Sequence, residues 1–111
     1  MPRLLTEEHT QHREELKAGR HSTAARYRNS GIITRAIGLD DEVVIDIHRT
    51  DWVEGDSLLL CSDGLDGVSL EMISDTCRHF PPEQAAHRLV RHAGEVNGSD
   101  NATALVVAYT N

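Results

Sequence analysis

The hydrophobic positions of the chain follow two periods, one typical of strands and one typical of helices. Strand composition occurs in residues 32–37, 43–48, 58–60 and 102–109. Within the second segment, Val43, Ile45 and Ile47 alternate onto one face, as in a half-buried strand. The continuous apolar run at 58–60 predicts a strand buried on both faces, which requires helices or a second sheet as cover.

Three other segments carry helix signals. Thr6 is a suitable cap for a first helix, with acidic residues after it and Gly19 as its stop. Ser69 and the pair Pro81-Pro82 open two more helices, because serine is a favoured cap and proline fits a first turn. Their apolar stripes are Leu70, Ile73 and Cys77 in one helix, and Ala85, Ala86, Leu89, Val90 and Ala93 in the other, which ends before Gly94. The chain is therefore predicted to be α+β, with two helices packed on a sheet.

The segment between the first helix and the first strand is polar and basic. It shows no regular hydrophobic period, so it reads as a surface excursion or a marginal helix. We expect a flap over residues 18–31.

Composition narrows the class of protein. The 111 residues suit one small domain or part of one. A formal net charge of −7 argues against a nucleic-acid groove or an anionic membrane surface and favours a cationic partner or a bound metal. Neither a signal segment nor a membrane-spanning stretch is present, so no membrane partner is expected.

The two cysteines also bear on the compartment. Cys61 lies in a strand pattern and Cys77 in a helical one, and neither has a second cysteine beside it. Buried, reduced thiols are therefore favoured over a disulfide, and a cytoplasmic location is expected.

Candidate chemistry lies where two apolar strands meet acidic turns. Asp63 follows the strand at 58–60 and is followed by Gly64, which would let the backbone turn sharply. Asp100 precedes the last strand. The two carboxylates could lie at one edge of a sheet and share a hard cation. The alternative is that Asp-Gly and Asp-Asn are ordinary turn dipeptides.

Several motifs occur together in an order that resembles a known family. They are Leu5-Thr6-Glu7-Glu8-His9-Thr10, Ile33-Thr34-Arg35-Ala36-Ile37-Gly38, Gly55-Asp56, Leu59-Leu60-Cys61-Ser62-Asp63-Gly64-Leu65 and Asp100-Asn101-Ala102-Thr103. In this order they resemble the metal-dependent protein phosphatases of the 2C (PPM) type, and the bacterial serine/threonine members look closest. The resemblance covers nearly the whole chain, from about Leu5 to Val107.

The resemblance implies a fold larger than this chain. The family fold is a four-layer α-β-β-α sandwich of two antiparallel sheets with helices outside. Residues 1–111 would then form a single partial domain, the C-terminal portion, including the flap. The Asp-Gly-His-Gly-Gly segment that supplies the bridging aspartate in the family does not occur in this sequence.

The resemblance also implies roles for particular residues. Asp63 and Asp100 match catalytic metal ligands, with two or more Mn²⁺ or Mg²⁺ ions in the intact family domain. Glu8 stands where the family usually has an aspartate near the flap; it is a candidate ligand or a helix-start glutamate favoured by the helix dipole. Gly64 would support the first turn, while Asn101 would orient the Asp100 carboxylate or cap its turn.

Other polar residues admit simpler interpretations. Asp66 suits a turn better than a supporting role near a metal. The seven histidines lack the spacing of a zinc site and are expected to be solvated. Arg26, Arg28 and Arg35 could contact a phosphorylated substrate, although exposed arginines usually only keep a surface soluble.

The function implied is a protein phosphatase acting on phosphoserine and phosphothreonine in proteins. We expect the chain alone to bind divalent ions weakly and to turn over little or no substrate, because a separate N-terminal phosphatase half would supply the other ligands. Two alternatives stay open: a non-catalytic phosphatase-like interaction module, and a stand-alone metal-binding domain of another kind.

Overall fold

The computed structural model describes residues 2–28, 31–96, 98 and 100–110. Two compact units form. Leu4–Thr50 is the N-terminal unit, and Asp51–Asn111 with Met1–Arg3 is the C-terminal unit. Each has its own packing, and the interpretation of the whole chain as one partial domain stays a prediction.

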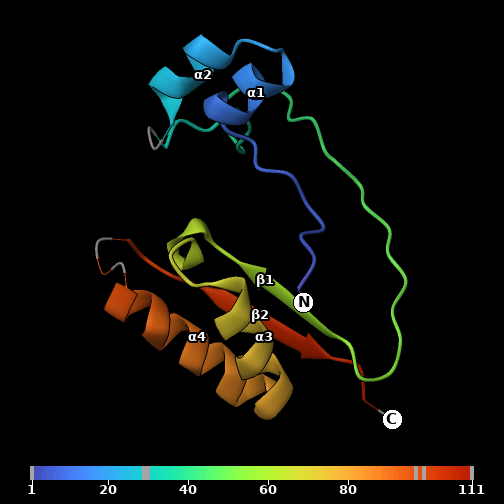
Figure 1. Cartoon of the computed structure of the whole chain (residues 1–111). Coiled ribbons are helices and arrows are strands. Elements are labelled where there is room, and N and C mark those ends of the chain that lie inside the picture. Colours follow the sequence, from blue (N-terminus) through green and yellow to red (C-terminus); the bar gives the residue numbers. More distant parts are fainter. Residues whose placement is uncertain (1, 29–30, 97, 99, 111) are drawn as a thin grey trace. The chain divides into compact units, whose positions relative to one another are not determined.

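A two-stranded antiparallel sheet organises the C-terminal unit. β1 (Ser57–Cys61) pairs with β2 (Ala104–Ala108), so that Leu59 lies opposite Val106 and Cys61 opposite Ala104 (Figure 1). Both strands lie within or next to segments that the hydrophobic pattern predicts as strands. The α+β class and the antiparallel pairing are confirmed.

Two helices follow the short 3₁₀ turn η1 (Asp63–Leu65). In α3 (Leu70–His79), Ser69 is the N-cap, and its hydroxyl accepts a hydrogen bond from the Met72 amide at 3.1 Å. α4 (Pro82–Val96) begins at proline, as predicted, but continues through Gly94. A helical glycine costs about 1 kcal/mol relative to alanine, which the buried face of a long helix can offset.

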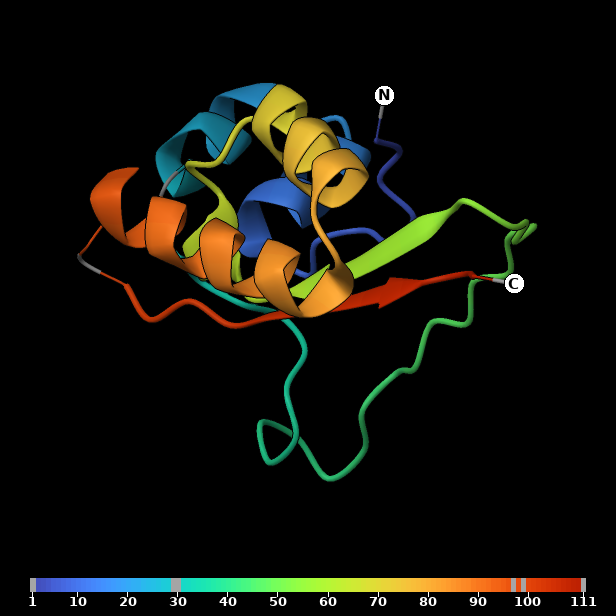
Figure 2. The same ribbon diagram turned by 90° about the horizontal axis from the view of Figure 1, so that it is seen from below.

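The core of this unit lies between α4 and the sheet. Figure 2 shows α4 lying along the sheet on the side of β2, with α3 packed beside α4. The buried apolar residues are Leu65, Val68, Ala85, Leu89, Ala93 and Val106. Since Ala85, Leu89 and Ala93 recur every four residues on α4, the predicted stripe is the face that is buried.

The opposite face of the sheet is open. Successive side chains of a strand point to opposite faces. Val106 is buried, whereas its neighbours Leu105 and Val107 are 57% and 42% exposed, and Leu60 on β1 is 51% exposed. The prediction that 58–60 is buried on both faces is therefore wrong for this structure, because helices cover only one face.

Two short helices form most of the N-terminal unit. α1 (Gln11–Lys17) is capped by Thr10, whose hydroxyl accepts from the Arg13 amide at 3.1 Å, so Thr6 is not the cap. Gly19, at φ 77°, follows the helix, and its amide donates to the Leu16 carbonyl at 3.1 Å. The predicted glycine stop is confirmed, because the left-handed conformation suits glycine.

The polar segment after Gly19 contains a helix. α2 (His21–Tyr27) packs against α1, and its Ala24 is buried with its carbonyl 2.9 Å from Nδ1 of His12. Of the two interpretations given for this segment, a surface excursion or a marginal helix, the helix is the one that the structure contains. A flap over residues 18–31 stays a prediction, and Asn29 and Ser30 lie outside the described residues.

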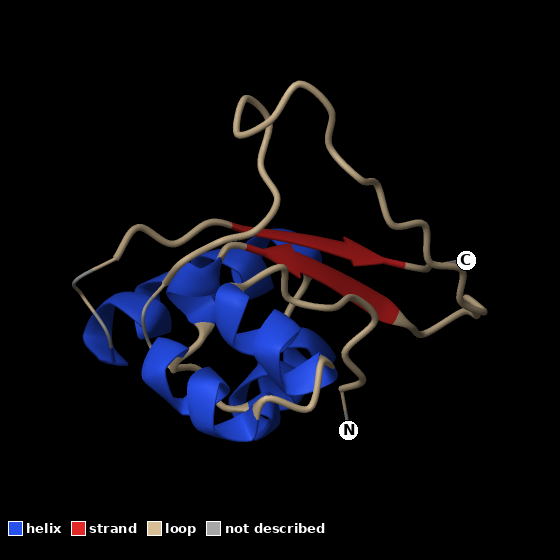
Figure 3. Ribbon diagram, turned by 90° about the horizontal axis from the view of Figure 1, so that it is seen from above, coloured by secondary structure: helices blue, strands red, loops and turns tan. Residues whose placement is uncertain are grey.

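The two predicted strands at 32–37 and 43–48 do not form. Figure 3 shows the stretch between α2 and β1 as loop. The β-bridges of its described residues are isolated ones, Thr10–Ile33 and Ile37–Asp40. Apolar alternation makes a strand only where a neighbouring strand supplies backbone hydrogen bonds. Ile45 and Ile47 are consequently 76% and 81% exposed.

Leu89→Ala should lower the free energy of unfolding of the C-terminal unit by about 2–5 kcal/mol, because it leaves a cavity in the core. Trp52, the single tryptophan, lies with its ring centroid 5.8 Å from that of Tyr109, so denaturation followed by its fluorescence reports on this unit. Leu105→Ala is the matched control and should cost clearly less. An equal loss for both variants would contradict the one-sided core.

Candidate functional site

The first candidate aspartate is presented at the end of β1. Asp63 is exposed and begins η1, and its carbonyl accepts a hydrogen bond from the Asp66 amide at 3.0 Å. The next two residues, Gly64 and Leu65, are buried. The buried leucine anchors the turn in the core, so the carboxylate sits on a short and rigid element.

The second candidate aspartate lies just before β2. Asp100 is exposed, and its Oδ1 accepts a hydrogen bond from the Asn101 amide at 2.8 Å. Because the strands are antiparallel, the start of β2 lies beside the end of β1. Figure 1 shows the segment entering β2 running beside the turn after β1. The pairing thus brings together the segments that carry Asp63 and Asp100.

Ser62 ties these two segments together. Its amide donates to the Thr103 carbonyl at 3.0 Å, and its hydroxyl accepts from the Thr103 amide at 3.0 Å. The same hydroxyl donates to the Asn101 carbonyl at 3.5 Å. Ser62 was not predicted from the sequence, although a hydroxyl directly before the candidate carboxylate Asp63 was an available signal.

Gly64 allows the closest approach between the segments. A β-carbon at this position would lie 2.2 Å from the Asn101 carbonyl oxygen and 2.8 Å from the Ala102 Cα. Gly64 is not among the glycines with positive φ. The sharp turn expected from the sequence therefore does not explain why glycine occupies this position. The reason is steric, since only a residue without a side chain fits beside the other backbone.

The donor set at this edge suits a hard cation but is incomplete. Asp63 and Asp100 offer carboxylate oxygens, which such cations prefer. Within the described residues, no group of three or more His, Cys, Asp or Glu side chains is arranged to hold a metal ion. Glu8 is exposed and belongs to the N-terminal unit. The edge therefore offers two exposed carboxylates, and ligation of a metal ion by all three residues stays a prediction.

Neighbouring residues act through the backbone or stay outside the site. The backbone N–H of Asn101 donates to the Asp100 carboxylate, and its backbone carbonyl accepts from the Ser62 hydroxyl. These contacts use the backbone of Asn101, not its side chain. Asp66 closes the η1 turn, as expected. Cys61 is exposed overall, not buried as expected. Partial desolvation of its sulfur, and then the negative charge of Asp66, raise the pKa of its thiol. A raised pKa makes the thiol a poor nucleophile near neutral pH.

A separate ionic cluster lies in the N-terminal unit. Asp46 accepts hydrogen bonds from Nη1 of Arg35 and Nε2 of His9, both at 2.8 Å. The Arg35 guanidinium, and then His9, lower the pKa of Asp46 to about 2. Arg35 is therefore held by a carboxylate, while Arg26 and Arg28 are exposed. His9 is paired rather than simply solvated.

The chain is similar in sequence to known bacterial phosphatases, although no family model matches it. The serine/threonine phosphatase stp of Listeria monocytogenes is 32% identical over 111 residues, which cover 95% of this chain and 43% of that protein. The protein phosphatase PhpP of Streptococcus pneumoniae is 36% identical over 108 residues, covering 94% and 44%.

A solved structure matches both the sequence and the fold. It is the PPM Ser-Thr phosphatase MsPP from Mycobacterium smegmatis in complex with cacodylate, with a TM-score of 0.75 and 32% identity over 94% of this chain and 46% of that chain. The chain is thus similar to part of a PPM-type phosphatase, which is consistent with the expected C-terminal portion. It spans less than half the length of these relatives.

Gly64→Ala should lower the free energy of unfolding by about 1–3 kcal/mol or more, because the new methyl group meets backbone rather than a movable side chain. Gly94→Ala is the control: nothing lies within 4 Å of a β-carbon added there, and helix propensity predicts stabilisation of about 0.5–1 kcal/mol. Urea denaturation measures both. Equal effects of the two variants would contradict the close approach.

The Asp46 cluster predicts acid sensitivity of the N-terminal unit. A lowered carboxyl pKa contributes stability that is complete above the unfolded value of about 3.9 and is lost as the pH falls towards 2. NMR titration of the Asp46 carboxyl should give a midpoint near 2. Arg35→Ala should raise that midpoint more than His9→Ala does, because arginine is the larger cause. An unchanged midpoint in Arg35→Ala would contradict the assignment.

Proposed function

We propose that this chain supplies one edge of a metal-dependent centre that hydrolyses phosphoserine and phosphothreonine in proteins. The observation that carries the proposal is the hydrogen-bonded contact of Ser62 with the segment 101–103, which holds together the two segments bearing Asp63 and Asp100. The names of the relatives, serine/threonine and protein phosphatases, support the reaction class.

The metal is proposed to be Mn²⁺ or Mg²⁺, with two or more ions in the complete centre. Both cations favour oxygen ligands, and carboxylates on rigid turns fit that preference. A divalent ion held here would activate water and neutralise charge on the phosphoryl oxygens.

The residues of the chain have simple tasks in this proposal. Asp63 and Asp100 ligate, Ser62 positions both of their segments, and Gly64 allows the segments to touch. Glu8, in the N-terminal unit, is proposed separately as a ligand of a further, weakly held metal ion near the flap. Each task concerns holding oxygen atoms in place, which is the contribution a protein makes to a metal centre.

The remaining ligands are proposed to come from a separate N-terminal phosphatase half. Two carboxylates leave most of the coordination shell of a divalent ion to other groups. We therefore expect the 111-residue chain alone to bind metal weakly and to show little or no turnover.

A second candidate function is a non-catalytic interaction module. The open sheet face with Leu60, Leu105 and Val107 favours it, because exposed apolar surface of this kind marks a contact with another polypeptide. A partner bound there would keep its affinity after divalent ions are removed by a chelator, whereas the metal centre would not function.

The location proposed is cytoplasmic, as the free cysteines suggested. Within the part of the chain that the structure describes, none of the helices has the length and apolar character needed to cross a bilayer.

Metal binding tests the proposal. Calorimetric titration with Mn²⁺ should show weak binding that falls on the order of tenfold in Asp63→Asn and in Asp100→Asn, because each variant replaces a charged ligand. Asp75→Asn, an exposed aspartate on α3, is the matched control and should bind as the natural chain does. Equal binding by all variants would overturn the ligand assignment.

Activity provides a separate measurement. The chain alone should not release phosphate from a phosphothreonine peptide with Mn²⁺. Turnover by the chain alone that is abolished in Asp63→Asn would contradict the need for a separate half.

A further inference from the structure

A groove of about 730 Å³ lies between α3 and α4 in the C-terminal unit. Figure 2 shows these two helices packed side by side. The groove is lined by residues of the two helices and by Phe80 between them, so it is separate from the edge that carries Asp63 and Asp100. Its volume lies within the range of clefts that bind other molecules, about 300–1,000 Å³.

Apolar side chains and a stacked cation form part of the groove lining. Phe80 is half-buried, and Met72 is 37% exposed. The Arg88 guanidinium carbon lies 3.8 Å from the centroid of the Phe80 ring, so the cation is held over the aromatic face. Stacking of this kind fixes a guanidinium while the N–H groups at its edge can still donate to an acceptor.

Two opposite charges in the lining come from different helices. Asp75 lies on α3 and Arg88 on α4, and both are exposed. Neither takes part in an ion pair between described residues. The other arginine and the other carboxylate of the lining, Arg91 and Glu95, already lie 4.0 Å from one another. Asp75 and Arg88 are therefore the charges that a partner can pair.

A surface with this charge pattern is complementary to itself. In a two-fold symmetric pair, one residue contacts a second residue of the other copy, and the second contacts the first in return. Asp75 of each copy can then meet Arg88 of the other. The net charge of −7 opposes association of two copies, but salt screens charges that lie more than about 8 Å apart at physiological ionic strength. The short-range charges across the groove therefore decide which surface makes the contact.

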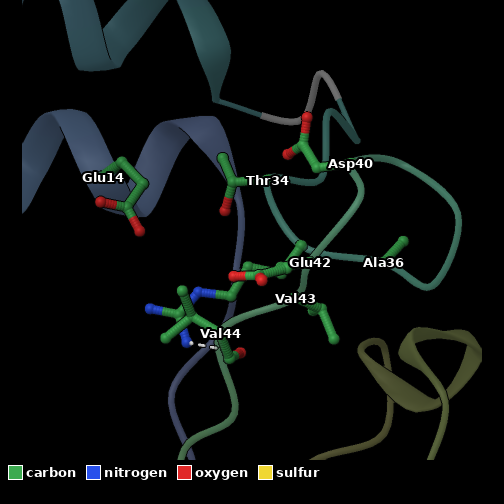
Figure 4. A pocket seen from close by; sticks show the side chains of 8 residues that line it. Glu14, Thr34, Ala36, Asp40, Glu42, Val43 and Val44 are labelled. Carbon is green, nitrogen blue, oxygen red and sulfur yellow. Dashed lines mark hydrogen bonds between the residues drawn. The ribbon is translucent and has the colours of Figure 1, made fainter.

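The hollow in the N-terminal unit does not have this property. Figure 4 shows it between α1 and the loop that follows α2, with Glu14, Asp40 and Glu42 around it. Arg35, the cation of its lining, is already held by Asp46 at 2.8 Å. Two copies of that lining would bring like charges together, which disfavours association.

We propose that the α3–α4 groove is the contact surface of a homodimer, with a second copy of this chain lying against it. The contact covers Met72 and Phe80 of both copies, and Asp75 of each copy pairs with Arg88 of the other. Glu8, Asp63 and Asp100 take no part in it. The proposal therefore goes beyond the phosphatase function and does not rest on it.

Sedimentation equilibrium of the full chain tests the proposal. The natural chain should form a dimer whose fraction rises with concentration. Asp75→Arg and Arg88→Glu should each weaken the dimer by at least about tenfold, because each variant places like charges opposite one another. An equimolar mixture of the two variants should restore the dimer, since every charge in the mixed pair again meets its opposite. Restoration also shows that both variants are folded.

Two further variants separate this surface from others. Leu105→Lys changes the open face of the sheet, where Leu105 is 57% exposed, and should leave the dimer unchanged. Asp63→Asn should also leave it unchanged, which distinguishes this test from that of the phosphatase centre. A natural chain that stays monomeric, a mixture that fails to dimerise, or a dimer lost in Leu105→Lys but kept in Asp75→Arg would each overturn the proposal.

Discussion

The C-terminal unit depends on the contact between two backbone segments, 62–64 and 101–103. Ser62 makes hydrogen bonds to Thr103 and Asn101, and Gly64 leaves room for the second backbone to pass. If the segments separated, the aspartates would lose their common edge. This contact begins directly where the strand pairing ends, since β1 stops at Cys61 and β2 starts at Ala104.

The hydrophobic core on one face of the sheet stabilises this contact. Leu65 follows Gly64 directly and lies in the same core as Leu89 and Val106. The turn that presents Asp63 is therefore anchored by apolar packing, while the carboxylate itself stays exposed. This division is common in functional sites, where a rigid packed scaffold carries exposed polar groups on short turns.

Electrostatics differ between the two units. In the N-terminal unit, Arg35 is held by Asp46. In the C-terminal unit, two exposed carboxylates lie on neighbouring turns. The charge of Asp46 is thus balanced within the chain, whereas the two exposed carboxylates of the C-terminal unit are the ones proposed as metal ligands.

Local signals were enough to predict α3, α4 and the end of α1, because Ser69, Pro82 and Gly19 act within a few residues of the chain. The motifs around Asp63 and Asp100 likewise favoured placing both residues at one edge of a sheet. The strands expected at 32–37 and 43–48 failed, since strand formation needs a distant partner that no local pattern contains. The steric need for Gly64 arises from Asn101 and Ala102, 37 and 38 positions further along the chain. The low pKa of Asp46 arises from Arg35 and His9, 11 and 37 positions before it, so both features emerged only from the folded arrangement.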